Sequence, residues 1–164
     1  MSKILAIKAR QILDSRGNPT LEVDVITKEG LSRASVPAGA STGKHEALEL
    51  RDHKKDFFGK SVMNAVKNIE KLSKKFVGID CANQELIDRA LIDLDGTDNK
   101  SKLGANTILA LSMACCRAGA LSKGIKLYEH INEIAELDKK MILPRPFFNV
   151  MNGGLHAGTH LQIQ

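Results

Sequence analysis

Residues 105–123 read ANTILALSMACCRAGALSK, and this stretch decides the fold. Wound as a helix, it carries apolar side chains on nearly every side, which is typical of a helix buried in the middle of a domain. Gly124 follows directly and is expected to end the helix. The rest of the chain must therefore supply elements that pack around it.

The residues at the start of the chain alternate between apolar and polar. This period of two over residues 3–13, 20–25 and 31–36 predicts three β-strands. The turns between them, at 14–19 and 28–30, are short, so consecutive strands should be antiparallel neighbours. The sequence therefore predicts a three-stranded antiparallel meander.

Helical periodicity appears in the middle of the chain. Apolar residues recur every three or four positions over 62–76 and again over 127–134. Asn83 is a typical N-cap for a further short helix. The apolar residues expected to mark that helix are Leu86, Ala90 and Leu91. Residues 1–138 are therefore predicted to form an α+β domain in which a meander is followed by helices.

Residues 139–164 follow a different pattern. Pro144 and Pro146 interrupt the chain, and residues 147–151 and 160–164 read as two strands. A domain rarely ends inside an alternating strand, because its unpaired edge is an aggregation hazard. We therefore expect these residues to be the start of a second domain.

Composition narrows the class of protein. The chain has 164 residues, of which 43% are hydrophobic and 26% charged, which is usual for a soluble globular domain. No apolar run approaches the ~20 residues of a membrane-spanning helix, so no membrane association is expected. Three cysteines are too few for a disulfide framework, and we interpret them as buried thiols in a reducing compartment, which favours the cytoplasm.

The net charge of +5 raises the question of a nucleic-acid partner. However, the lysine doublets at 54–55, 74–75 and 139–140 appear scattered along the chain, with acidic residues nearby. Tryptophan is absent and there is a single tyrosine, so aromatic platforms for bases are scarce. From the sequence, solvated surface charge is the better interpretation, and no nucleic-acid partner is expected.

Residues 37–43 contain no large apolar side chain and are expected to form a loop. Gly39, Gly43 and Lys44 resemble a phosphate-binding loop, but only three residues separate the glycines and His45 stands where Ser or Thr is required. A Gly- and Ser-rich loop can still close over an anion or a metal-bound ligand through its N–H, C=O and hydroxyl groups. The alternative is an ordinary surface loop.

Two other motifs were weighed for chemistry. His156 and His160 have the spacing of zinc ligands on a helix, but Ala157 stands where the zinc-protease motif has Glu. Glycines surround His156, so either its imidazole is presented to a ligand or the turn carries it incidentally. Glu46 and Glu49 lie beside Arg51 and Asp52 and are interpreted as a solvated or ion-paired stretch rather than an acid–base pair.

Four groups of residues together resemble the enolase (phosphopyruvate hydratase) family. They occur in the family's order and at matching separations. The groups are DSRGNPT (14–20), GASTG (39–43) with HEALE (45–49) and RD (51–52), LDGT (94–97) with NKSKLGAN (99–106), and NGG (152–154) with HA (156–157). The set is far more specific than any one of its parts.

The resemblance implies a fold and a reaction. Residues 1–138 would be the N-terminal capping domain of an enolase, and residues 139–164 the opening strands of a β/α barrel. The family uses Mg²⁺ to dehydrate 2-phosphoglycerate to phosphoenolpyruvate and water in glycolysis and gluconeogenesis. A Lys removes a proton and a Glu helps to expel the hydroxyl; both are expected beyond Gln164, as are the carboxylates of the first metal site. This chain alone is therefore expected to be inactive.

The resemblance also assigns roles to individual residues. Ser41 matches the residue of a lid loop that ligates the second Mg²⁺, and His156 and Gln164 match substrate-binding residues. Arg10 and Glu22 match positions that form ion pairs across the family's homodimer interface. The lid loop comprises Gly39, Ala40, Ser41, Thr42 and Gly43.

Two alternatives remain open. One is an enzyme of the same superfamily with another acid substrate, against which the Ser41 loop and the segment Gly104-Ala105-Asn106 argue, because both belong to enolases proper. The other is a non-catalytic, enolase-derived module that binds or regulates a partner.

Overall fold

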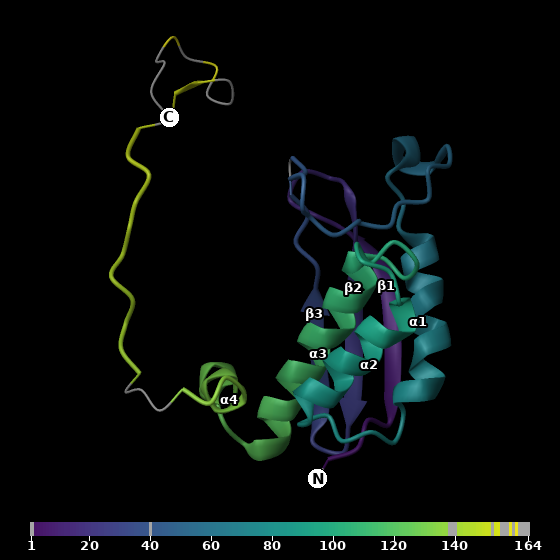
Figure 1. Cartoon of the computed structure of the whole chain (residues 1–164), viewed down its shortest axis with the longest axis vertical. Coiled ribbons are helices and arrows are strands. Elements are labelled where there is room, and N and C mark those ends of the chain that lie inside the picture. Colours follow the sequence, from purple (N-terminus) through teal and green to yellow (C-terminus); the bar gives the residue numbers. More distant parts are fainter. Residues whose placement is uncertain are drawn as a thin grey trace.

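Three consecutive strands form one antiparallel sheet in the order β1-β2-β3 (Figure 1). The strands are β1 (Ala6–Leu13), β2 (Pro19–Thr27) and β3 (Gly30–Ser35). The predicted meander is therefore confirmed. The computed structural model describes residues 2–39, 41–137, 141–151, 153, 154, 158 and 160.

Helices cover one face of this sheet (Figure 1). α3 packs on β2 and β3, α1 packs on β1, and α2 and α4 pack on α3. The helical elements are the short turn η1 (Asp56–Gly59), α1 (Met63–Phe76), α2 (Gln84–Asp95), α3 (Ala105–Lys123) and α4 (Leu127–Ile134). The predicted α+β arrangement is confirmed, including both ends of the central helix.

The core lies between the sheet and α3. Alternate residues of β2 point toward the helices and are fully buried, and so are the residues of α3 that face them. These residues are Leu21, Val23 and Val25 of β2, and Ala110, Leu111, Ala114, Cys115 and Ala118 of α3. Burial raises the pKa of the Cys115 thiol, because the charged thiolate is poorly solvated there. This cysteine therefore acts as a small apolar core residue.

The helix predicted after Asn83 is confirmed as α2, but only part of its apolar surface is buried. Leu86 is 46% exposed, whereas Ile87 and Leu91 are fully buried. The cap at Asn83 is as predicted: its side-chain oxygen accepts a hydrogen bond of 3.2 Å from the Leu86 backbone N–H. The helix that starts there turns Ile87 and Leu91, four residues apart, toward α3. α3 is likewise not covered all round, since Leu109 is 43% exposed.

The strand expected over residues 147–151 is absent. Residues 141–151 form no helix or strand, and Phe147, Phe148 and Val150 are largely exposed. A strand exists only where a neighbouring backbone accepts its hydrogen bonds, and no described strand lies beside this segment (Figure 1). The strand predicted over 160–164 falls almost entirely outside the described residues.

α4 follows α3 after a sharp turn at Gly124, whose φ is 67°. The two helices are bent by 104° relative to each other. In the described part of the chain no single helix has the length and hydropathy needed to cross a membrane, and only this bent pair, taken together, reaches the threshold.

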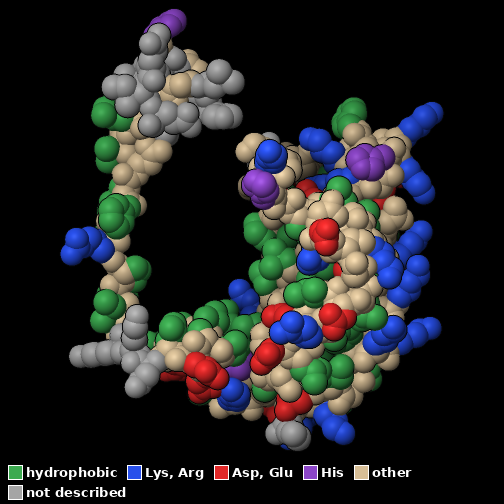
Figure 2. Space-filling model, in the orientation of Figure 1, with side chains coloured by type: hydrophobic (Ala, Val, Ile, Leu, Met, Phe, Trp, Pro, Cys, Tyr) green, Lys and Arg blue, Asp and Glu red, His purple; other side chains and the backbone are tan. Residues whose placement is uncertain are grey.

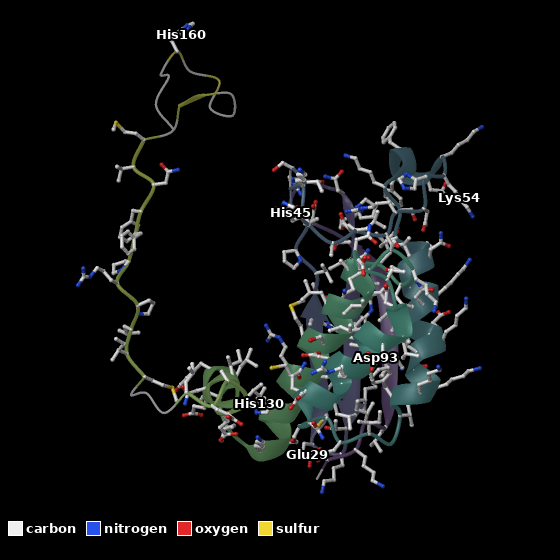
Figure 3. The ribbon with its side chains drawn as sticks, in the orientation of Figure 1. Glu29, His45, Lys54, Asp93, His130 and His160 are labelled. Carbon is white, nitrogen blue, oxygen red and sulfur yellow. The ribbon has the colours of Figure 1, made fainter. Side chains whose placement is uncertain are left out.

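One buried histidine holds α4 against α3. His130 is fully buried, and neither ring nitrogen has a hydrogen-bond partner among the described residues (Figure 3). A Cβ added to Gly119 of α3 would lie 2.5 Å from His130 Nε2 and 3.0 Å from the Cys81 carbonyl oxygen. Only glycine at 119 therefore leaves room for the imidazole. Burial, and then the nearby charge of Lys123, lower the pKa of His130, which favours the neutral ring.

A buried carboxylate organises the outer face of the sheet. Asp24 accepts hydrogen bonds from Arg33 at 2.6 and 3.0 Å and also pairs with Arg10, which in turn pairs with Glu22. The hydrogen bonds from Arg33 outweigh the opposing effect of burial and lower the pKa of Asp24 to about 2.

We expect Gly119→Ala to destabilise the domain by about 1–3 kcal/mol, because the added Cβ overpacks the contact between α3 and His130. The sign of the change in unfolding free energy distinguishes the two cases, because Gly→Ala inside an unconstrained helix would stabilise the protein by about 1 kcal/mol. Urea unfolding of both single variants and the double variant with His130→Ala measures the coupling. A Gly119→Ala protein more stable than the parent would contradict the packing described.

The second prediction concerns acid unfolding. Asp24 has a folded pKa of about 2 and an unfolded pKa near 4, so its stabilisation is present above about pH 4 and is lost as the pH falls toward 2. Asp24→Asn should remove about 2 kcal/mol at pH 7 and flatten the stability profile between pH 4 and 2. The matched control is Asp93→Asn, an exposed residue of α2 (Figure 3), which should leave the profile unchanged.

Candidate functional site

The turn between β1 and β2 is organised by the carboxylate of Asp14. One of its oxygens accepts hydrogen bonds from the backbone N–H groups of Asn18 and Arg16, at 2.8 and 2.9 Å. The bond from Asn18 is the main cause of a lowered pKa for Asp14, so the carboxylate stays charged. The turn therefore holds the Arg16 backbone in place and presents its guanidinium beyond the end of the sheet.

Arg16 fastens this turn to the start of the Gly/Ser loop. Its Nη2 donates to the carbonyl oxygens of Ala38 at 2.8 Å and Gly39 at 3.2 Å. Just before them, the buried hydroxyl of Thr20 donates to the Val36 carbonyl at 2.6 Å. The entry to the loop is thus held by two side chains from the preceding part of the sheet.

The exit from the loop is held more firmly. The Asn106 side chain accepts from the Leu50 N–H and donates to the Leu50 carbonyl, both at 3.1 Å. Leu48 forms two further backbone hydrogen bonds of 2.8 Å, donating to Asn99 and accepting from Ala105. These backbone and side-chain hydrogen bonds attach residues 48–50 to the start of α3.

Gly104 makes this close approach possible. Its φ is 93°, and an added Cβ would lie 2.5 Å from the Leu50 Cβ and 2.6 Å from the Asn106 side-chain oxygen. A left-handed backbone with no side chain is therefore required at this position. The segment 99–106, which carries part of the resemblance, acts as the platform for residues 48–50.

Between these two anchors the loop is exposed. Ser41, Thr42 and His45 are exposed, and Figure 3 shows His45 on the loop at the outer edge of the domain. The one described turn inside the loop is closed by Glu46, which accepts from the Gly43 N–H at 2.8 Å and whose own N–H donates to the Gly43 carbonyl at 3.2 Å. A segment with few internal contacts between firm anchors is suited to opening and closing.

The loop borders two polar clefts. The first, of about 320 Å³, contains the hydroxyls of Ser41 and Thr42 and the carboxylates of Glu46 and Glu49. The second, of about 240 Å³, is lined by three cationic side chains and one carboxylate. The charged residues of the second cleft are Arg16, Glu49, Arg51 and Lys60. Positive charge next to exposed loop groups fits a negatively charged small molecule.

Neighbouring groups already engage several of these charges. Arg51 pairs with Glu49 at 2.6 Å and donates to the carbonyls of Pro19 and Lys60, each at 2.6 Å. Glu46 is bonded to Gly43. The predicted ion-paired stretch around 46–51 is thus present for Glu49, while Glu46 serves the loop backbone.

Ser41 fits a Mg²⁺ ligand in kind, because its hydroxyl and carbonyl are hard oxygen donors. One residue does not complete a site. Within the described residues no three His, Cys, Asp or Glu side chains are grouped so that they could hold a metal ion. Ser41 could therefore supply only part of a coordination shell.

The structure describes only some of the remaining predicted site residues. Ala40, His156 and Gln164 lie outside the described residues. Arg10 and Glu22 pair with each other within one sheet, next to Asp24, so these two charges are balanced inside a single chain. Their role at a dimer interface stays a prediction.

Sequence reasoning missed three structural roles. Arg16 and Asn106 were quoted within motifs, but no contact was assigned to either. Asp52 caps α1 from eleven residues upstream, accepting from the N–H groups of Met63 and Asn64 at 2.9 Å each. The only available signal was the missing N-cap residue, because Val62 directly before the helix has no side-chain oxygen.

We expect Arg16→Ala to loosen the loop entry, because two carbonyl oxygens lose their shared donor. Amide exchange of the segment 37–46 should become about fivefold to tenfold faster, while global stability falls by less than about 1 kcal/mol, since Arg16 is largely exposed. Hydrogen exchange with mass spectrometry measures both, with Arg89→Ala, an exposed arginine of α2, as the control. Unchanged exchange in 37–46 would show that Arg16 does not anchor the loop.

Comparison with known families gives one clear match. The family model described as Enolase, N-terminal domain, matches residues 4–131. The matched region is well over half of the chain, runs from just before β1 into α4, and includes the loop, both of its anchors and the three-stranded sheet. The chain therefore belongs to the enolase family, whose N-terminal domain it carries.

Proposed function

We propose that this domain serves phosphopyruvate hydratase, the lyase that converts 2-phosphoglycerate to phosphoenolpyruvate and water. The observation that carries the proposal is the exposed loop with Ser41, held at one end by Arg16 and at the other by Asn106, in a chain of the enolase family. Such a loop can close over a ligand without disturbing the sheet or α3.

In this proposal each part of the site has a defined task. Bound Mg²⁺ would supply positive charge where negative charge develops on the substrate carboxylate. Ser41 would contribute its hydroxyl and carbonyl oxygens to the second ion when the loop closes. Arg16 would keep the loop entry fixed, so that closure moves residues 40–45 rather than the whole segment.

The other parts of the enzyme are also proposals. Residues 139–164 would open a β/α barrel that supplies the Lys base, the Glu acid and the first metal site, with His156 and Gln164 binding the substrate. Arg10 and Glu22 would face a partner subunit in a cytoplasmic homodimer, exchanging their pairing within the chain for pairs across the interface. Without the barrel the domain has no activity of its own in this scheme.

A chimera tests the proposal: residues 1–138 are joined to the barrel of a characterised enolase, and phosphoenolpyruvate formation is followed. Ser41→Ala should raise the Mg²⁺ concentration needed for turnover about 10- to 150-fold, because one ligand to a charged centre is lost. Binding of the first ion, measured by calorimetry without substrate, should be unchanged.

Ser73→Ala, on α1 and remote from the loop, is the control for the chimera. A folded chimera with no activity would favour the non-catalytic module instead. If the chimera is active and Ser41→Ala leaves the Mg²⁺ dependence of turnover unchanged, Ser41 is not a metal ligand and the loop is an ordinary surface loop.

A further inference from the structure

Six exposed lysines line one edge of the domain. The doublets Lys54-Lys55 and Lys74-Lys75 look scattered in the sequence, but α1 joins them, with Lys67 and Lys71 between. Figure 2 shows the basic side chains gathered along this edge, and Figure 3 shows Lys54 pointing outward at one end of it. We call Lys54, Lys55, Lys67, Lys71, Lys74 and Lys75 the lysine edge.

The charges of the lysine edge are balanced only in part: Lys54 lies close enough to Asp52 for its charge to contribute to lowering the pKa of that carboxyl. Among the described residues none of the six forms an ion pair, although Asp56 and Glu70 are exposed on the same stretch. By contrast, Lys28 and Lys123 on other surfaces pair with Glu29 and Glu133.

Spacing along α1 brings like charges together. Lys67, Lys71 and Lys75 follow one another at intervals of four residues, so they repel on one face of the helix. Lys74 and Lys75 gain from the helix dipole at the C-terminal end, but Lys67 and Lys71 do not. Helix stability alone therefore does not account for the row of lysines on α1.

An exposed aromatic residue stands at one end of the lysine edge. Phe57 and Phe58 both have left-handed backbones, with φ of 50° and 55°, and Phe58 is 99% exposed. This conformation is unfavourable for side chains larger than glycine. The backbone conformation at Phe58 exposes the apolar ring to solvent, and no contact within the domain accounts for this exposure.

The loop that carries Phe58 is fixed to the start of α1. His53 N–H donates to the Gly59 carbonyl at 3.1 Å, and Asp52 N–H donates to the Ser61 carbonyl at 2.8 Å. The side chain of Asp52 also caps α1. The turn η1 thus lies beyond the N-terminal end of α1 (Figure 1).

We propose that the lysine edge and Phe58 bind single-stranded nucleic acid, with phosphates along α1 and an unpaired base stacked on the Phe58 ring. α1 is about 21 Å long and presents four of the six lysines along this length to the phosphates of a single strand. Lysine suits phosphate as a mobile point charge, and an exposed aromatic ring accepts any base. This departs from the expectation drawn from the sequence, where the doublets seemed unrelated.

Other polyanions fit the surface less well. An acidic protein segment would use the lysines but gain nothing from the exposed ring. A flat lipid surface needs its basic and apolar contacts in one plane, whereas Phe58 belongs to η1, which precedes α1 and its lysines rather than lying beside them. A linear polymer that carries both charged and aromatic groups can contact the lysines and the Phe58 ring together.

Fluorescence anisotropy with a labelled 12-nucleotide oligo(U) RNA tests the proposal on the 164-residue chain. We expect weak, salt-dependent binding, with a Kd in the range of about 10⁻⁶–10⁻⁴ M. Replacing Lys67, Lys71 and Lys75 by Gln should weaken binding at low salt at least about tenfold and reduce the salt slope by about 2, since each contact with a single strand adds about 0.7. Phe58→Ala should weaken binding about 5- to 100-fold without changing the slope.

The control removes the same charge elsewhere, by changing Lys3, Lys8 and Lys28 to Gln. Equal losses in the two triple variants would show that only net charge matters and would overturn the proposal. Poly-glutamate that displaces the RNA equally well from the parent and from Phe58→Ala would assign the edge to acidic proteins instead. Tighter binding to phosphatidylserine vesicles than to RNA would assign it to membranes.

Discussion

The pairing of Asn106 with the backbone of Leu50 is the contact on which the candidate site depends. It joins the chain that leaves the Gly/Ser loop to the first turn of the buried helix α3, and it requires the bare, left-handed Gly104 beside it. With this end fixed to the core and Arg16 holding the other, the exposed residues between them can move while the sheet stays unchanged. A loop without either anchor would lose its position relative to any neighbouring domain.

Periodicity and capping were enough to predict most of the fold. Alternation predicted the meander, and the apolar segment ending at Gly124 predicted α3, because these patterns record which side chains meet the core. Periodicity did not predict that α2 buries Ile87 and Leu91 and leaves Leu86 exposed, because the phase of a short helix depends on where its first turn is capped. The strand predicted over 147–151 is not formed in this chain, because an apolar run predicts how a strand would pack, not whether a neighbouring strand is present.

The site was predictable only as a set of motifs. The loop around Ser41 was identified as flexible because it lacks large apolar residues, but its anchors join residues 22 and 56 positions apart in the sequence. Spacing in a sequence does not reveal contacts of that range. For the same reason the lysine doublets seemed unrelated until α1 placed them on one edge. The role of Arg10 at a dimer interface depends on a partner subunit, and the contacts of Arg10 within this chain do not test it.

The central claim is that this domain carries Ser41 into the metal site of an enolase. The most direct measurement is a crystal structure of the chimeric enzyme with Mg²⁺ and 2-phosphoglycerate bound. The account predicts the loop closed, with the Ser41 hydroxyl and carbonyl oxygens about 2.0–2.1 Å from the second ion, while the bonds from Asn106 to Leu50 and from Arg16 to Ala38 are retained. An occupied second site with Ser41 turned away from the ion would contradict it.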